Sequence, residues 1–291
     1  MKAIVPIDFS LGSRAAVKFA LNLSELLPEM ELEFLYCNTL VHPSHARIHT
    51  IKLPTAAEQR NKILAEMKHF VERTAAERSL VLKGVSYHFE DRAKAAPAII
   101  EAAQAGKANL IVMGTTGSSN LRRIVMGSTA VKVMEGAPCA VITVPLGYRI
   151  RSIKEIAVGS ELVNPVKEMR FVHNLLSGLQ AHYTIFHVYP VFPQKVVPTK
   201  TYMAQIEEKL RTFLDAGRFS LLLVKTKEEN QLSAGLEKGI KRIHPGLLVM
   251  FHRKRNWLDK ILSRSETASL VFHTKVPVMS VRTDLLKKVE G

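Results

Sequence analysis

The 291-residue chain contains 47% hydrophobic and 23% charged residues, which excludes an intrinsically disordered protein and predicts two globular domains. Its longest apolar runs, such as residues 247–251, fall far short of the ~20 residues that span a bilayer, so no membrane segment is expected. A net charge of +15 is typical of proteins that bind nucleic acid. Residues 1–150 carry 18 basic and 13 acidic side chains, and residues 151–291 carry 23 and 13, so the positive excess is concentrated in the second half.

The two cysteines and the amino-terminal segment indicate a reducing compartment. Cys37 and Cys139 both lie in apolar segments, which predicts two buried thiols rather than a disulfide scaffold. Asp8 interrupts the first apolar stretch too early for the core of a signal peptide. A cytoplasmic protein is therefore expected.

In the first half of the chain, short β-branched runs alternate with longer amphipathic segments. Thr55 followed by Glu58 forms a capping box, which marks a helix start. Continuously apolar strands separated by amphipathic helices predict a parallel sheet with both faces covered. The expected strands are 3–7, 32–37, 81–89, 110–113 and 140–144, and the expected helices lie near 13–27, 55–79, 95–105 and 128–136.

The second half repeats the first. "KAIVPIDFS" from Lys2 resembles "KEIAVGSEL" from Lys154, and the 24 residues from Leu110 align without a gap to those from Leu247. Asn164 and Pro165 mark a helix start. Two tandem doubly wound α/β domains with Rossmann-like open five-stranded parallel sheets are therefore predicted, over 1–149 and 150–291. The expected strands of the second are 153–158, 183–188, 219–224, 247–251 and 276–281.

Glycines and hydroxyl residues follow the fourth expected strand, at the sheet edge where open parallel sheets collect ligands. Gly114 and Gly117 come directly after that strand, and Asp8 directly after the first. Gly127, Ser128 and Thr129 would open a helix whose free N–H groups suit phosphate. The alternative is that these glycines only turn the chain. The spacing is neither a Walker A loop nor a dinucleotide-binding glycine motif.

The pattern Gly-x2-Gly-x9-Gly-Ser from Gly114, with "VPIDFS" at 5–10 and "APCAVITVP" from Ala137, resembles three signatures of the universal stress protein family. With both copies in one chain, the sequence resembles the tandem members, and an adenine nucleotide α-hydrolase-like fold is implied. The resemblance implies ATP binding, with Mg²⁺ bound through the phosphates. Asp8 would then lie near ribose or metal, residues 38–41 near adenine, and the glycines and hydroxyls near ribose and phosphates. The implied binding residues are Pro6, Ile7, Asp8, Phe9, Ser10, Asn38, Val41, Met113, Gly114, Gly117, Gly127, Ser128 and Thr129.

The second copy lacks this pattern, so one nucleotide site per chain is predicted, in the first half. The fold there accepts bulky residues in place of glycine, which indicates that the chain turn alone does not demand the glycines of the first copy. The residues aligned with Asp8, Gly114, Gly117 and Gly127 are Ser160, Phe251, Lys254 and Arg264.

Two further segments have alternative interpretations. His42, His45 and His49 would supply three imidazoles for zinc, but their spacing matches no standard metal motif, which favours exposed histidines on a lid. The basic run 252–257 would bind an anion or nucleic acid, although a solvated loop is favoured because no nucleic-acid motif accompanies it.

The sequence favours a binding module over an enzyme. Phosphoryl transfer needs metal-binding carboxylates, and Asp8 is the single candidate at the expected edge, so at most slow ATP hydrolysis is expected. A nucleotide-responsive module that changes its contacts with an unidentified protein partner is predicted. The rival is a structural protein without nucleotide, whose basic second half recruits an acidic partner or nucleic acid. The resemblance also implies pairing of strands 140–144 and 276–281 as a pseudo-dimer within one chain, with a homodimer as a further option.

Overall fold

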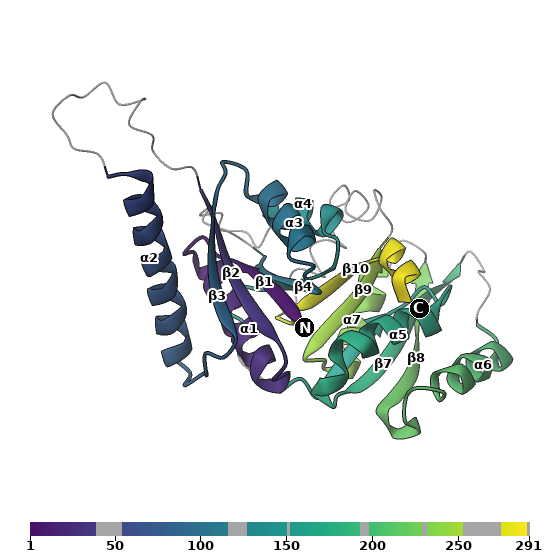
Figure 1. Ribbon diagram of the computed structural model, residues 1–291. Helices are drawn as coiled ribbons and strands as arrows, with labels where there is room; N and C mark the ends of the chain where they lie inside the picture. Colours follow the sequence, from purple (N-terminus) through teal and green to yellow (C-terminus); the bar gives the residue numbers. More distant parts are fainter. Residues whose placement is uncertain are drawn as a thin grey trace. The chain divides into compact units, whose positions relative to one another are not determined.

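A computed structural model describes residues 1–38, 54–115, 127–149, 152–192, 198–228, 232–252 and 275–289. The chain divides into two compact units, of which the first ends at Leu146 and the second begins at Gly147. Each unit contains five parallel strands flanked by helices (Figure 1). The prediction of a doubly wound α/β fold is thereby confirmed. None of the helices within the described ranges is long and apolar enough to cross a bilayer.

The first unit alternates strands and helices from its amino end. Its strand order is β3-β2-β1-β4-β5, so the order reverses between β1 and β4. Helices α1 and α2 pack on each other, as do α3 and α4. The elements are β1 (Lys2–Pro6), α1 (Leu11–Leu26), β2 (Glu31–Asn38), α2 (Ala56–Ala76), β3 (Val85–Asp91), α3 (Ala95–Ala105), β4 (Leu110–Gly114), α4 (Ser128–Gly136) and β5 (Ala140–Val144).

The second unit repeats this order as β8-β7-β6-β9-β10. Helices α5 and α6 pack on each other, and α7 lies on β7 and β8. The elements are β6 (Glu155–Gly159), α5 (Pro165–Leu176), η2 (Ser177–Leu179), β7 (His182–Phe192), α6 (Lys200–Leu210), η3 (Ala216–Arg218), β8 (Phe219–Glu228), α7 (Leu232–Ile243), β9 (Leu247–His252), β10 (Val278–Arg282) and η5 (Thr283–Val289).

Local signals explain where several elements begin. The capping box is present, because Glu58 N donates to the Thr55 hydroxyl at 3.2 Å and Thr55 N donates to the Glu58 carboxylate at 2.6 Å. Strand β3 was expected from Val81 but starts at Val85. Gly84 adopts φ +57°, a turn conformation that ends the preceding segment, and Val81 is half exposed.

The backbone hydrogen bonds correct the alignment of the two first strands by one residue. Ile7 N donates to Leu35 O in the first unit, and Ser160 N donates to Phe186 O in the second, so Ser160 is the counterpart of Ile7. The next positions agree, because Phe9 and Leu162 share left-handed φ values of 60° and 58°. The counterpart of Asp8 is therefore Glu161, and the earlier pairing of Asp8 with Ser160 is wrong. Because both strands are short and apolar, a sequence alignment cannot distinguish the correct pairing from one shifted by a single residue.

Candidate functional site

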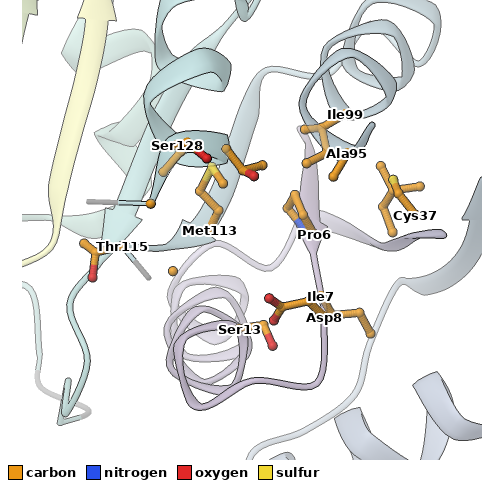
Figure 2. A pocket seen from close by; sticks show the side chains of 15 residues that line it. Pro6, Ile7, Asp8, Ser13, Cys37, Ala95, Ile99, Met113, Thr115 and Ser128 are labelled. Carbon is orange, nitrogen blue, oxygen red and sulfur yellow. The ribbon is translucent and has the colours of Figure 1, made fainter. Parts of the chain in front are cut away.

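A cavity of about 240 Å³ lies in the first unit where β1 and β4 end, at the point of strand-order reversal. Open parallel sheets bind ligands at this place, because the loops leaving neighbouring strands diverge there. Figure 2 shows the surrounding side chains, with Ala95 and Ile99 coming from α3 and Ser128 from α4. The lining residues are Pro6, Ile7, Asp8, Ser13, Leu35, Cys37, Ala95, Ile99, Met113, Gly114, Thr115, Gly127, Ser128, Thr129 and Ala130.

The structure brings most of the expected binding residues together at this cavity. Phe9, Ser10 and Asn38 are not among its lining residues, and Val41 and Gly117 lie outside the described residues. Sequence reasoning missed Ser13, Leu35, Cys37, Ala95, Ile99, Thr115 and Ala130. The expected residues that line the cavity are Pro6, Ile7, Asp8, Met113, Gly114, Gly127, Ser128 and Thr129.

Phe9 and Ser10 have structural roles beside the cavity. The Phe9 ring packs on Tyr36 and Phe70, with ring centroids 4.9 and 5.4 Å away, so it anchors the chain against β2 and α2. The Ser10 hydroxyl accepts a hydrogen bond from Ser13 N at 3.1 Å and caps α1. These contacts fix where α1 begins relative to β1.

Asp8 stabilises the turn between β1 and α1. Its Oδ1 accepts the backbone N–H of Ser10 at 3.1 Å, which closes a short turn across the left-handed Phe9. The residue is exposed and also lines the cavity, where it can meet a ligand. Asp8 therefore has a structural role in addition to any binding role.

Gly114 is required by packing within the first unit. A Cβ at this position would lie 2.5 Å from the backbone carbon and oxygen of Gly12 in α1, a distance at which atoms collide. Packing against Gly12 therefore accounts for this glycine without a ligand. Phe251 replaces it in the second unit, where Pro165 stands in place of Gly12 and the helix begins one residue later in the corrected alignment. The presence of a bulky residue at this position in the second unit therefore does not show that the first unit would accept one.

The amino end of α4 faces the cavity without a side-chain cap. Gly127 occupies the N-cap position with φ −63° and ψ 144°, an extended conformation open to any residue, and it supplies no capping group. The N–H groups of Ser128, Thr129 and Ala130 belong to the first turn, where helices leave donors without intrahelical partners. All three residues line the cavity, so α4 presents donors and a positive dipole end to it.

Thr115 holds the floor of the site in place. Its N–H donates to Val144 O at 3.0 Å, and its carbonyl accepts Gly127 N at 2.7 Å, which ties β4 to β5 and to the start of α4. Within the described ranges its hydroxyl has no hydrogen-bond partner, although the residue is only 4% exposed. A buried hydroxyl without a partner costs about 1–3 kcal/mol, a cost that a ligand acceptor would remove.

Cys37 contributes a thiol to the cavity wall. Burial, followed by the neighbouring Glu90 carboxylate, raises the pKa of this thiol to about 11. It is therefore protonated at neutral pH and acts as a small apolar group there. The expectation of a buried thiol is correct for Cys139, whereas Cys37 is half-buried. β2 contributes Leu35 and Cys37 to the wall, whereas the resemblance implied residues 38–41; Asn38 does not line the cavity, and residues 39–41 lie outside the described residues.

The second unit fills the corresponding space with side chains. Gly159 is the counterpart of Pro6, and the sulfur of Met250 lies only 2.6 Å from where its Cβ would stand. Half-buried Phe251 takes the place of Gly114. Lys254 and Arg264, aligned with Gly117 and Gly127, lie outside the described residues, as does the basic run beyond His252.

Within the described residues, no group of three or more His, Cys, Asp or Glu side chains is placed to hold a metal ion. His42, His45 and His49 lie outside them, so the zinc alternative stays a prediction.

The sequence model described as "Universal stress protein family" matches residues 1–145. A universal stress protein of Methanocaldococcus jannaschii is 34% identical over 148 residues, which cover 49% of this chain and 81% of that protein. The chain belongs to the universal stress protein family. This membership rests on the first unit, where the cavity lies.

Solved structures extend the likeness of fold to both units of this universal stress protein. A universal stress protein from Archaeoglobus fulgidus has a TM-score of 0.62 at 15% identity, covering 97% of this chain and 96% of its own. A functionally unknown protein from Pseudomonas aeruginosa PAO1 has a TM-score of 0.59 at 15% identity, covering 99% and 95%. At these identities the likeness shows the tandem fold alone.

Proposed function

We propose that this universal stress protein binds ATP, together with Mg²⁺, in the cavity of its first unit and acts as a nucleotide-responsive regulatory module. The observation that carries the proposal is the uncapped amino end of α4, which faces a cavity at the point of strand-order reversal. Helix amino ends and such switch points are the general phosphate and nucleotide sites of open α/β sheets.

The chemistry of the lining supports an adenine nucleotide. Leu35, Ala95, Ile99 and Met113 supply an apolar wall suited to a base, and the protonated Cys37 adds to it. Ser128 and Thr129 supply hydroxyls beside the free N–H groups of α4, which suit phosphate oxygens. Sugar and phosphate would lie between these two regions.

The balance of charge supports a role for the metal ion. Among the described residues that line the cavity, Asp8 is the one carboxylate and there is no lysine or arginine. A triphosphate in this cavity would therefore place negative charge near Asp8. A Mg²⁺ ion bound through the phosphates would offset that repulsion, with Asp8 as one ligand.

The second unit is proposed to bind no nucleotide in this way, because Met250 and Phe251 occupy the space beside the ends of β6 and β9. The expected stoichiometry is one ATP per chain. The second unit would then serve structure or partner contacts.

Thermal unfolding in the presence of Mg-ATP tests the proposal. A ligand that binds only the folded state at 100 times its Kd stabilises that state by about 2.7 kcal/mol, so the melting temperature is expected to rise with ATP concentration. A parallel titration with GTP measures whether the cavity distinguishes the two purine bases. An unchanged melting temperature at millimolar Mg-ATP would reject nucleotide binding.

Asp8→Asn separates the two roles of Asp8. Asparagine keeps an oxygen that can accept the Ser10 N–H, so stability is expected to stay within about 0.5 kcal/mol of wild type. Loss of the carboxylate is expected to weaken Mg-ATP binding about tenfold and to reduce its dependence on Mg²⁺. Titration with and without Mg²⁺ measures both effects. Wild-type affinity in this variant would restrict Asp8 to closing the turn.

A further inference from the structure

The turn that joins β6 to α5, residues 160–164, adopts a backbone that needs support. Leu162 lies at its centre with φ +58°, a left-handed conformation that branched side chains rarely adopt, and its side chain is buried. Such a conformation persists only where the surrounding contacts over-determine it. The neighbouring Val163 side chain is 60% exposed, so it contributes little of that support.

Four hydrogen bonds hold this turn closed. Leu162 N donates to the Ser160 hydroxyl at 2.9 Å, and that hydroxyl donates to Glu168 Oε2 at 2.5 Å. Tyr202 of α6 donates its hydroxyl to Leu162 O at 2.6 Å, and His187 Nδ1 of β7 lies 2.8 Å from Ser160 O. The Glu168 carboxyl thus lies at the end of the chain of bonds that fixes Leu162.

Glu168 is poorly placed to carry a charge. It belongs to the first turn of α5, is 5% exposed, and its carboxyl accepts a hydrogen bond from the Ser160 hydroxyl. No ion pair joins it to a lysine or arginine of the described residues, whereas the nearby Glu161 repels a negative charge on it. Burial is the larger cause and raises the pKa of Glu168 to about 7.

Among the described residues, the ionisable groups on the elements packed against α5 form no ion pair with Glu168. Tyr202 of α6 and His187 of β7 are hydrogen-bonded to carbonyl oxygens of the turn. Arg282 and Asp284, next to and within η5, form an ion pair with each other at 2.7 Å. Ser160 and Glu161 act on the Glu168 carboxyl in opposite directions, because the Ser160 hydrogen bond lowers its pKa and the Glu161 charge raises it, and burial outweighs both.

We propose that residues 160–168 form a proton-linked latch, which holds the start of α5 against β6 most firmly while Glu168 carries a proton and loosens when that proton is lost. The latch belongs to the unit that is proposed to bind no nucleotide, and it is independent of ATP binding. Opening would release Leu162 from its left-handed conformation and expose its apolar side chain beside Val163. The second unit would thereby couple pH to the surface that it presents to a partner.

The direction of the pH effect follows from the two protonation equilibria. In the open turn Glu168 titrates near its ordinary value of 4.5, and in the closed turn near 7. The closed state then binds more protons between these values, so its population relative to the open state falls as pH rises across that window, by at most about tenfold per pH unit. Well above pH 7 the ratio of the closed to the open state no longer changes with pH.

Hydrogen exchange at the Leu162 amide of the full chain tests the latch. After correction for intrinsic exchange, protection is expected to fall about 40-fold between pH 5 and pH 7 and then to change little. Glu168→Gln cannot ionise and is expected to keep its protection across the range. Glu161→Gln removes the repulsion and leaves Glu168, so the fall is expected to end at a lower pH.

The outcomes decide the proposal in each case. Protection of wild-type Leu162 that is independent of pH would overturn the latch, whatever the variants do. The same fall in Glu168→Gln would assign the effect to another group and would also overturn it. A fall in wild type and Glu161→Gln that is absent from Glu168→Gln would support it. Since no nucleotide is needed, these results do not depend on ATP binding.

Discussion

Alanine at position 114 is expected to destabilise the first unit by about 3 kcal/mol, near the upper end of the cost of overpacking a core. The added methyl group would meet the backbone of Gly12 at 2.5 Å, and backbone cannot move aside as the end of a flexible side chain can. Relief would require α1 to shift away from β4. Urea denaturation of Gly114→Ala, compared with wild type, measures the change in free energy of unfolding.

Two other glycines provide matched controls. A Cβ at Gly136 would meet the flexible end of Ile100 at 2.6 Å, so Gly136→Ala is expected to cost under about 1 kcal/mol. Nothing lies within 4 Å of a Cβ at Gly217, so Gly217→Ala is expected to be neutral or slightly stabilising. Equal stability of all three variants would refute the packing account. If only Gly114→Ala loses stability, any loss of ATP binding in that variant would be attributed to unfolding.

Gly127 allows binding to be separated from folding. Aspartate is a favoured N-cap residue, so Gly127→Asp is expected to stabilise α4 by a few tenths of a kcal/mol. The same carboxylate would occupy the N–H groups proposed to hold phosphate and would repel it. Like charges brought together cost several kcal/mol, so a loss of ATP affinity of at least about 100-fold is expected.

Gly127→Asn is the matched control, because asparagine caps equally well without the charge. Its ATP affinity is expected to fall much less than that of the aspartate variant. Calorimetric titration measures affinity, and thermal unfolding confirms that both variants are folded. Equal affinity in wild type and Gly127→Asp would place the phosphates away from α4.

The elements with clear local signals were predictable from the sequence. α3, α4 and β5 begin and end where expected, because apolar periodicity changes sharply at Ala95, Ser128 and Ala140. Strand β7 runs to Phe192, beyond the expected end at 188, because its ladder with β8 continues past Pro190. Long-range pairing of this kind leaves no signal in a local pattern.

The candidate site was predictable only in part. The glycine pattern placed Gly114, Gly127 and Ser128 at the cavity, because the pattern begins where the fourth strand of the first unit ends. Ala95 and Ile99 reach the same cavity from α3, and nothing in an alanine-rich helix marks two residues as ligand-facing. The packing role of Gly114 was equally hidden, because Gly12 lies about a hundred positions earlier in the chain.

The stoichiometry of Mg-ATP binding to the full chain tests the central claim most directly. One nucleotide site in the first unit predicts a calorimetric titration with one ATP per chain in wild type and no saturable binding in folded Gly127→Asp. Two sites per chain, no saturable binding to wild type at millimolar ATP, or unchanged binding in Gly127→Asp would each contradict it.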